Sequence, residues 1–552
     1  MIDFLRNIFL YIAFLLLGAC SAFQTNFKTP NIDSYPFEIP KVIQINDTLR
    51  VFKNNYLLKN KQNLWELHSQ GNPYQLGLTS GALLENLYKQ QDSIFYQKIN
   101  SFVPSARKQK FLFYFLKWFN RDIEKNIIPE YRAELYGISH YSDSIYNIYS
   151  PAYQRVMYLH GAHDIGHALQ DLMLVACSSL VVWGDKTPDG KLLIGRNLDF
   201  YVGDDFAQNK VISFIKPSSG IPFMSVGWAG MIGVVSGMNK EGLSVTINAS
   251  KSDIPLKAKT PISLLCREIL QYASTIDEAI AIAKKRAVFV SENILIGSAK
   301  DKKAVIIEIS PKKIDVFEPQ NSDNLICTNH FQSATYQNDK NNVKQINETH
   351  SFYRYQKLEE LLNYSKKITP ESMAEILRNT EGLENKSIGY GNEKAINQLL
   401  AHHGIIFKPE EKLVWVSANP YQLGEFVCYD LERIFSTDFQ SFSIAETSQK
   451  NISKSTFLSS QEYKNYEKYR VLERKMELAL KTSQIIEKEE VVRLKELNPD
   501  YWKAYFIIGK ILYQQKNKEA TENFEKSLSL EIPYLEERKE VEKYLKKSKK
   551  LK

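Results

Sequence analysis

The chain has 552 residues, of which 43% are hydrophobic and 24% charged, an ordinary composition for a folded globular protein. This length predicts about three or four structural units of roughly 150 residues each. The formal net charge is +8, and the segment from residue 451 onward supplies most of it, with 23 Lys and Arg against 17 Asp and Glu. No recognition motif with interleaved aromatic residues accompanies this basic segment, so we expect no nucleic-acid binding.

An apolar run, residues 8–17, follows Arg6 and ends in Leu17-Gly18-Ala19-Cys20. Such a run before small residues predicts a secretory signal, and it is too short to span a bilayer, which takes about 20 residues. The ending resembles the bacterial lipobox, whose Cys is diacylated and becomes the mature N-terminus. Residues 1–19 are therefore predicted to be a signal peptide. We expect a lipid anchor on Cys20 and a place in the bacterial cell envelope, at the outer membrane, with the membrane face left open.

Residues 20–176 are predicted to form a mostly helical segment that packs on the rest of the chain. Residues 21–57 indicate a polar approach to the fold, and residues 64–68 a strand. The turn that starts at Gly71-Asn72-Pro73 leads into apolar residues at helical spacing, and further helices follow as far as residue 173.

The pattern changes after residue 174, where short apolar runs alternate with turns. One helical stretch, residues 263–286, interrupts them. Strands followed by helices and further strands predict an α+β layered domain over residues 177–455. The predicted strands cover residues 179–183, 192–196, 211–215, 223–226, 243–248, 294–297 and 304–309.

Residues 456–552 are predicted to be a helical tail, continuously helical from Gln461. Residues 500–530 resemble a single tetratricopeptide repeat. Such repeats normally come in threes because one cannot bury its apolar faces alone. Two interpretations remain open, a plain helical appendage and a docking site for a protein partner. The matching positions are Tyr505, Ile508, Gly509, Leu512, Ala520, Phe524 and Pro533.

The five cysteines are scattered, and no two form a C-x-x-C motif, which argues against a disulfide framework. We expect one lipidated Cys, one catalytic Cys and three buried thiols. They are Cys20, Cys177, Cys266, Cys327 and Cys428.

Cys177 opens one predicted strand, and Arg196 and Asp199 close the next, so a hairpin brings the three together. A free α-amino group on Cys177, with a pKa of about 7.7–8.0, could take the thiol proton and produce the nucleophilic thiolate. Arg196 would favour the thiolate, and Asp199 could accept a hydrogen bond from the amine. The alternatives are a buried structural thiol and an ion pair beside a turn.

This stretch resembles the cysteine N-terminal-nucleophile amidohydrolases, namely the choloylglycine hydrolases and, more closely, the penicillin acyltransferase family. The family motif Gly-Arg-Asn-x-Asp-Phe is matched by Gly195, Arg196, Asn197, Asp199 and Phe200. Four more segments match in family order, at residues 71–81, 233–248, 327–331 and 351–358.

The resemblance implies a four-layer αββα sandwich, an acyl-cysteine intermediate, and no metal or organic cofactor. It implies self-cleavage between Ala176 and Cys177. It assigns Asn248 to the oxyanion, Asn329 to the scissile amide and Arg354 to the active site. Two features depart from the family, since Ala176 stands where acyltransferases often have Gly, and the interval from Cys177 to Arg196 is longer than in short bile-salt hydrolases.

The predicted function is amide hydrolysis or acyl transfer on small N-acyl substrates. The sequence leaves the acyl group, the amine and the balance between hydrolysis and transfer open. One alternative is a lipid or ester hydrolase of the phospholipase-B-like type. The other is a non-catalytic lipoprotein that uses its helical tail for docking.

Two histidine pairs lie outside these motifs. His163 and His167 have the spacing of a zinc-binding helix, but Asp164 replaces the Glu of that motif and Gly166 weakens a helix. We therefore predict no metal site there, but a structural contact near the cleavage point. His402 and His403 are predicted to lie in a loop, with no specific function indicated.

Overall fold

The computed structural model describes residues 27–168, 175–436 and 448–551, except the single residues 202, 252, 254, 256, 483 and 485. The predicted signal peptide and Cys20 lie outside the described residues. Within the described part, no helix is both long enough and apolar enough to cross a lipid bilayer.

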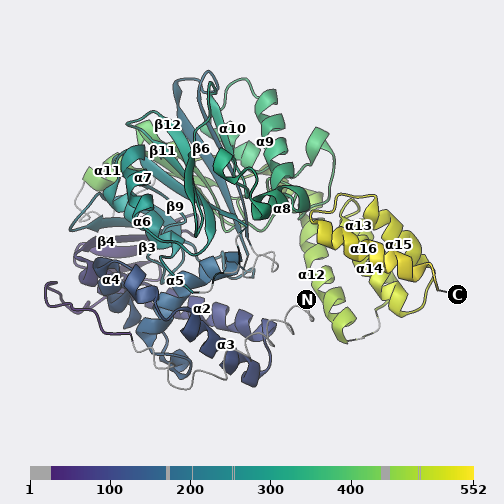
Figure 1. Cartoon of the computed structure of the whole chain (residues 1–552), viewed down its shortest axis with the longest axis horizontal. Coiled ribbons are helices and arrows are strands. Elements are labelled where there is room, and N and C mark those ends of the chain that lie inside the picture. The colour runs from purple at the N-terminus through teal and green to yellow at the C-terminus, as the bar shows by residue number, and fades with distance from the viewer. Residues whose placement is uncertain are drawn as a thin grey trace.

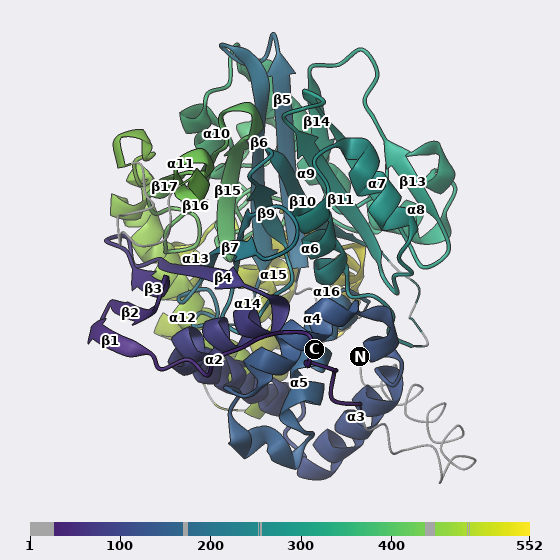
Figure 2. The ribbon, with the colours of Figure 1, turned by 90° about the vertical axis from the view of Figure 1, so that its left-hand side faces the viewer.

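Two β-sheets lie face to face at the centre of the molecule (Figures 1 and 2). The larger sheet has the strand order β1-β2-β3-β4-β7-β8-β9-β10-β11-β12-β13. Its strands are β1 (Ile43–Asn46), β2 (Leu49–Phe52), β3 (Asn55–Lys59), β4 (Trp65–Gly71), β7 (Val211–Pro217), β8 (Phe223–Gly227), β9 (Ser236–Asn239), β10 (Leu243–Ser250), β11 (Ser291–Ser298), β12 (Lys303–Ile309) and β13 (Ile314–Phe317).

The smaller sheet has the order β14-β5-β6-β15-β16-β17. Its strands are β14 (Asn324–Cys327), β5 (Val175–Gly184), β6 (Gly190–Phe200), β15 (His403–Lys408), β16 (Leu413–Ser417) and β17 (Phe426–Asp430). All of its pairings are antiparallel, and β5 and β6 form a hairpin.

Side-chain alternation along the strands divides the core into layers. On β11, Leu295 packs between the two sheets, whereas Ile294 and Ile296 point to the helices on the outer face. Those helices are α6 (Ile262–Tyr272) and α7 (Ile276–Lys284), and α9 (Ser351–Tyr364) and α10 (Pro370–Leu377) cover the outer face of the smaller sheet. The predicted αββα sandwich is therefore confirmed. Two shorter helices, α8 (Lys340–Glu348) and α11 (Leu431–Ser436), complete this part.

The helical stretch predicted over residues 263–286 is divided in the structure. The break lies at Thr275, whose side chain accepts a hydrogen bond from the backbone of Glu278 in a capping box that starts α7. The predicted strands between residues 179 and 309 are all observed, with small shifts of their ends.

The N-terminal segment is built into the larger sheet. Strand β4 pairs in parallel with β7 along its whole length, and β1 to β3 extend the sheet beyond it. The predicted polar approach over residues 21–57 was therefore wrong. These strands have four or five residues and are joined by two-residue turns, too short for a two-residue period to be read.

Four helices follow β4 and lie below the sheets in Figure 1. They are α2 (Pro73–Phe102), α3 (Ala106–Phe119), α4 (Pro129–Ser139) and α5 (Ala152–Ala168). Asn72 caps α2 by accepting from the backbone of Gln75 at 3.0 Å, as expected for the turn before it. Gly77 lets α2 approach α4 closely, because a Cβ at this position would lie 2.0 Å from the carbonyl oxygen of Glu134.

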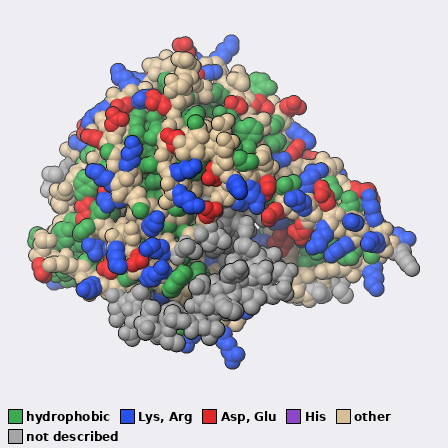
Figure 3. All heavy atoms as spheres, viewed as in Figure 1, with side chains coloured by type: hydrophobic (Ala, Val, Ile, Leu, Met, Phe, Trp, Pro, Cys, Tyr) green, Lys and Arg blue, Asp and Glu red, His purple; other side chains and the backbone are tan. Residues whose placement is uncertain are grey.

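The C-terminal helices form a separate bundle to the right of the sandwich in Figure 1. They are α12 (Gln461–Thr482), α13 (Lys488–Leu497), α14 (Trp502–Gln514), α15 (Glu519–Leu528) and α16 (Leu535–Ser548). Their core includes Tyr469, Trp502, Phe506 and Phe524. In Figure 3 basic and acidic side chains mix over this bundle. The helical tail from Gln461 is confirmed, and its assignment as a tetratricopeptide repeat stays a prediction.

Candidate active site

Cys177 lies near the start of β5, with its side chain only 1% exposed. Its thiol accepts a hydrogen bond from Nη2 of Arg196 at 3.3 Å, and its backbone N–H donates to Oδ1 of Asn329 at 3.0 Å. Burial raises the pKa of the Cys177 thiol, and the positive charge of Arg196 opposes that shift. The thiol in the uncut chain is thus held beside a positive charge that favours its reactive thiolate form, and the charge of Arg354 acts in the same direction.

The β5–β6 hairpin creates this proximity, as the sequence predicted. Its register places Cys177 opposite Leu198 and Ser179 opposite Arg196. Strand alternation then turns Cys177 and Arg196 to the same inner face. Gly195 is required on the other face, because a Cβ there would lie 2.5 Å from the sulfur of Met373 in α10.

Arg196 is fully buried between the sheets. Besides the thiol, it donates from Nη1 to the hydroxyl of Ser236 at 2.7 Å and from Nη2 to the carbonyl of Ile247. Both of these oxygen acceptors are neutral, and Nε has no hydrogen-bond partner among the described residues, so the charge of Arg196 stays available to stabilise a thiolate or a developing negative charge.

Asp199 lies on β6, opposite Ala176, and is fully buried. Neither of its carboxylate oxygens has a hydrogen-bond partner among the described residues. Burial raises the pKa of Asp199 to about 7, although Arg354 and Arg196 oppose the shift. Burying a carboxyl group that makes no hydrogen bond costs free energy. Asp199 can therefore accept a hydrogen bond from a new donor that forms beside Ala176 and Cys177.

The two predicted asparagines are both at the site. Asn329 bridges it, because its Oδ1 accepts from the Cys177 amide while its Nδ2 donates to the carbonyl of Ala249 at 2.8 Å. Asn248 is fixed at both ends, with Nδ2 donating to the carbonyl of Cys327 at 2.8 Å and Oδ1 accepting from Ser179 at 3.3 Å. A side-chain amide held in this way is preorganised to donate its second hydrogen to an oxyanion.

Arg354 reaches the same point from α9 and is fully buried. Its Nη1 donates to the carbonyl of Cys177 and to the hydroxyl of Ser178, the latter at 2.7 Å, and its Nη2 donates to Oδ1 of Asn329 at 2.6 Å. Hydrogen bonds therefore join Cys177 to Arg196, Asn329 and Arg354. Asp199 lies opposite Ala176, and Asn248 bonds to Ser179 and Cys327 beside them.

Two groups near the site were missed by the sequence analysis. His403 is not in a loop but begins β15, next to β6, and its Nε2 is 2.9 Å from the Ser236 hydroxyl that binds Arg196. His402 lies just before the strand, and its Nδ1 is 2.8 Å from Nδ1 of His403. Burial lowers the pKa of both well below the usual range. The apolar residues 405–407 were the signal that this segment is a strand.

The helix that contains His163 and His167 joins the N-terminal segment to the sandwich. Asp164 accepts from the backbone N–H of Ile262 at 2.8 Å, at the start of α6, and His160 accepts from that of Ile232 at 3.0 Å. Within the described part of the chain, no three His, Cys, Asp or Glu side chains converge on a point suited to a metal ion.

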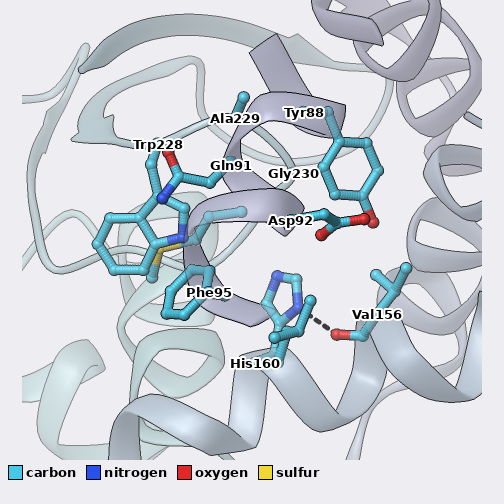
Figure 4. Close-up of a pocket in the computed structure, with 11 residues that line it drawn as sticks. Tyr88, Gln91, Asp92, Phe95, Val156, His160, Trp228, Ala229 and Gly230 are labelled. Carbon is cyan, nitrogen blue, oxygen red and sulfur yellow. Dashed lines mark hydrogen bonds between the residues drawn. The ribbon is translucent and has the colours of Figure 1, made fainter. Parts of the chain in front are cut away.

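A cavity lies where this helix, α2 and residues 228–231 meet (Figure 4). Trp228 forms one wall and stacks on Phe200, the residue after Asp199, at 5.7 Å between ring centroids. Gln91 and Asp92 contribute polar groups, and burial raises the pKa of Asp92 to about 6. The cavity volume of about 20 Å³ suffices for about one water molecule, so an N-acyl chain does not fit it in this conformation.

Three of the remaining four cysteines are free and buried in the structure, as expected. They are Cys266, Cys327 and Cys428, and burial raises the pKa of each thiol. Cys327 is the last residue of β14, the strand that leads to Asn329, and its thiol forms a hydrogen bond with the Thr328 carbonyl rather than with Arg196.

Comparison with known proteins confirms the resemblance for the central part of the chain. Residues 186–419 match the model of the family acyl-coenzyme A:6-aminopenicillanic acid acyl-transferase. The match includes five of the six catalytic candidates and begins after Cys177.

Curated relatives are distant and only partly covered. The chain is 24% identical over 273 residues to an uncharacterized protein of Archaeoglobus fulgidus. The matched region covers 45% of this chain and 44% of that protein. It is 25% identical over 211 residues to N-acylethanolamine-hydrolyzing acid amidase of Caenorhabditis elegans, covering 35% of this chain and 54% of the relative. The chain thus spans about half the length of these relatives.

Among solved structures, a mutant of the conjugated bile acid hydrolase from Clostridium perfringens is similar at 16% identity and a TM-score of 0.32. The similarity covers 49% of this chain and 96% of that one.

Proposed function

We propose that this chain, whose residues 186–419 match the acyl-transferase family model, is a self-processing amidase or acyltransferase with Cys177 as its N-terminal nucleophile. The observation that carries the proposal is the convergence of Arg196, Asn329 and Arg354 on Cys177. Beside them lies the buried Asp199, whose oxygens have no hydrogen-bond partner in the described part of the chain.

The first step is cleavage of the chain's own Ala176–Cys177 bond. The Cys177 sulfur attacks the Ala176 carbonyl carbon; a C–S bond forms, the C–N bond breaks, and the Cys177 nitrogen takes the proton. Water then hydrolyses the thioester, which releases a carboxylate on Ala176 and regenerates the thiol. Arg196 stabilises the attacking thiolate, because it donates to this sulfur.

Cleavage gives Cys177 a free α-amino group at the place where its amide now donates to Asn329. Protonated, this amine supplies the donor that Asp199 lacks, since Asp199 lies opposite Ala176 in the hairpin. The amine has a pKa of about 7.7–8.0 when unperturbed, so at neutral pH it can accept the thiol proton.

The same groups then serve an external amide. The thiolate attacks the substrate carbonyl, Asn248 donates to the oxyanion, and the ammonium group protonates the leaving amine. Water or a second amine resolves the acyl-cysteine, giving hydrolysis or transfer. Support for amide substrates comes from the family match and from the named activity of the nematode relative.

The lipid anchor on Cys20 belongs to the same proposal. It would hold the enzyme at the bacterial outer membrane and bring it close to amphiphilic N-acyl substrates. Radiolabelled palmitate incorporated into wild type but not into Cys20→Ser, with loss of membrane sedimentation in that variant, is the expected result; equal labelling of both would contradict the anchor. A protein partner for the C-terminal bundle remains a proposal that a pull-down with the full chain would test.

Turnover of a simple amide tests the enzymatic part. We expect wild type to hydrolyse lauric acid p-nitroanilide and Cys177→Ala to lose more than about a thousand-fold in kcat/KM. Cys428→Ala, which removes another buried thiol, should behave as wild type. A lauroyl adduct trapped on Cys177 would support the mechanism. Equal turnover by Cys177→Ala would refute it, and turnover of lauroyl esters with none of the amide would favour a lipid or ester hydrolase.

A further inference from the structure

The C-terminal bundle, which lies outside the family match, reaches the active site through one side chain. Tyr534 immediately precedes α16, and its hydroxyl is 2.8 Å from Nε2 of His350. The two rings also meet edge to face, with 4.9 Å between centroids. His350 in turn precedes α9, the helix that carries Arg354.

The hydrogen bond between Arg354 and His350 defines the histidine tautomer. Nε of Arg354 donates to Nδ1 of His350 at 2.9 Å, and an arginine is always protonated, so Nδ1 is the acceptor. Burial, together with the charges of Arg354 and Lys394, lowers the pKa of His350 well below its usual range and keeps the ring neutral. The single ring proton is therefore on Nε2, where it is donated to the Tyr534 oxygen.

This contact acts on the reacting groups through a short path. Arg354 uses its other nitrogens to hold the Cys177 carbonyl and Oδ1 of Asn329. A guanidinium is a rigid plane, so fixing Nε fixes the direction of both terminal nitrogens. Tyr534 thus determines, through His350, how Arg354 meets Cys177 and Asn329.

The bundle is held firmly where Tyr534 reaches the sandwich. Asn498 exchanges two hydrogen bonds with the backbone of Tyr390, at 3.0 and 2.8 Å. Glu531 pairs with Lys394 at 2.6 Å and with Lys386 at 3.0 Å. These contacts lie on the segment after α10 and flank the Tyr534 contact, so the phenol is presented at a defined position.

We infer that Tyr534 is a positioning residue of the active site, acting through His350 on Arg354, and that this one residue links the C-terminal bundle to catalysis. The inference rests on the proposed function for its kinetic consequence. It gives the tail a role that requires no external partner.

Removal of one hydroxyl group tests this. Tyr534→Phe keeps the ring but leaves Nε2–H of His350 without its acceptor. We expect a roughly ten-fold lower rate of self-cleavage during cell-free synthesis, and a similar fall in kcat for lauric acid p-nitroanilide with little change in KM. Tyr505→Phe is the matched control, since its hydroxyl donates within the bundle to Pro499 at 2.9 Å, and it should leave both rates unchanged.

A coupled pair separates positioning from general destabilisation. In His350→Asn the amide oxygen can still accept from Arg354, but the shorter side chain does not reach Tyr534. Adding Tyr534→Phe to this variant should change the rates by less than about two-fold if the tyrosine acts through the histidine. An undiminished ten-fold loss in the His350→Asn background would overturn the inference.

NMR spectra of the protein with isotope-labelled histidine test the contact between Tyr534 and His350 independently of activity. The His350 signal should show an Nε2–H tautomer in wild type and in Tyr505→Phe, and should shift in Tyr534→Phe. An unshifted His350 signal, or wild-type rates in Tyr534→Phe, would overturn the inference while leaving Cys177 as the nucleophile. Loss of amide turnover in wild type itself would refute the proposed function, and the histidine signal would still decide whether the Tyr534 oxygen accepts from Nε2–H of His350.

Discussion

The segments before and after the family match are attached to the sandwich in different ways. The N-terminal segment is joined to the sandwich by backbone hydrogen bonds, since its strand β4 lies inside the larger sheet between β3 and β7. The C-terminal bundle has its own apolar core. It meets the sandwich through side chains at residues 386–399 and 421–423, through ion pairs of Arg470 and Arg474 with Asp204, and through the contact between His350 and Tyr534.

The difference bears on what each segment can do. A chain cut between Ala176 and Cys177 would keep its N-terminal part, because strand pairing and buried contacts hold it after the covalent link is lost. The C-terminal bundle stays covalently attached to the sandwich. It can change the orientation of residues in the active site, but it supplies none of the six catalytic candidates. We call the contacts that attach each segment to the sandwich its joint. Variants at the two joints should differ in how much stability they cost and in how many elements they affect.

The largest effect is expected at the joint of the N-terminal segment. Arg267 of α6 pairs with Glu134 of α4 at 3.1 Å, and both side chains are almost fully buried. Arg267→Ala would leave the carboxylate uncompensated and should lower the free energy of unfolding by about 3–5 kcal/mol.

Arg286→Ala is the control for that variant. Arg286, just after α7, pairs with Glu268 of α6 but is partly exposed, so its loss should cost about 1 kcal/mol or less. Chemical denaturation of both proteins measures the difference. Equal, small losses would show that the buried pair does not hold the N-terminal segment in place.

A smaller effect is expected at Asp199, opposite the last residue of the N-terminal segment. Its pKa is raised from 3.8 to about 7, so its protonated form stabilises the fold at low pH, and that stabilisation is lost as the pH rises through 7. Asp199→Asn and its Asp199 parent both carry Cys177→Ala and so stay uncut. The free energy of unfolding of Asp199→Asn relative to that of the Asp199 parent should be about 3 kcal/mol higher at pH 8 than at pH 5. Denaturation at both pH values measures this gain, and a difference independent of pH would show that Asp199 titrates normally.

The smallest effect is expected at the joint of the bundle. Asn498→Ala removes both hydrogen bonds to the Tyr390 backbone and should cost about 2 kcal/mol. Hydrogen exchange should rise in α12 to α16 and stay unchanged in β4, α2 and α4. Asn465→Ala, at a half-buried position of α12 where the side chain accepts a hydrogen bond from Gln461 of the same helix, is the control. Faster exchange in β4 would show that the two joints are coupled.

The local parts of this arrangement could be predicted from the sequence, and the long-range parts could not. The hairpin that pairs Ser179 with Arg196 follows from two apolar runs and a turn, which placed Cys177 beside Arg196 in advance. The resemblance supplied Asn248, Asn329 and Arg354. Strands β1 to β3 were missed because they are too short for a two-residue period to be read. The position of His403 was missed because the apolar residues after it were not recognised as a strand.

The contact between His350 and Tyr534 had no signal in the sequence. The two residues are 184 positions apart and lie on different structural units, and neither belongs to a motif. Only the packing of the bundle brings them together. That Asp199 has no hydrogen-bond partner among the residues described was likewise invisible in the sequence, because it is a property of the folded site.

The most direct test of Cys177 as a self-generated N-terminal nucleophile is intact mass with N-terminal sequencing of wild type beside Cys177→Ala. We expect wild type to yield two chains that remain associated, the second beginning at Cys177, and Cys177→Ala to stay a single chain. A wild-type chain that remains uncut on prolonged incubation would remove the free amine from the mechanism and contradict the proposed function.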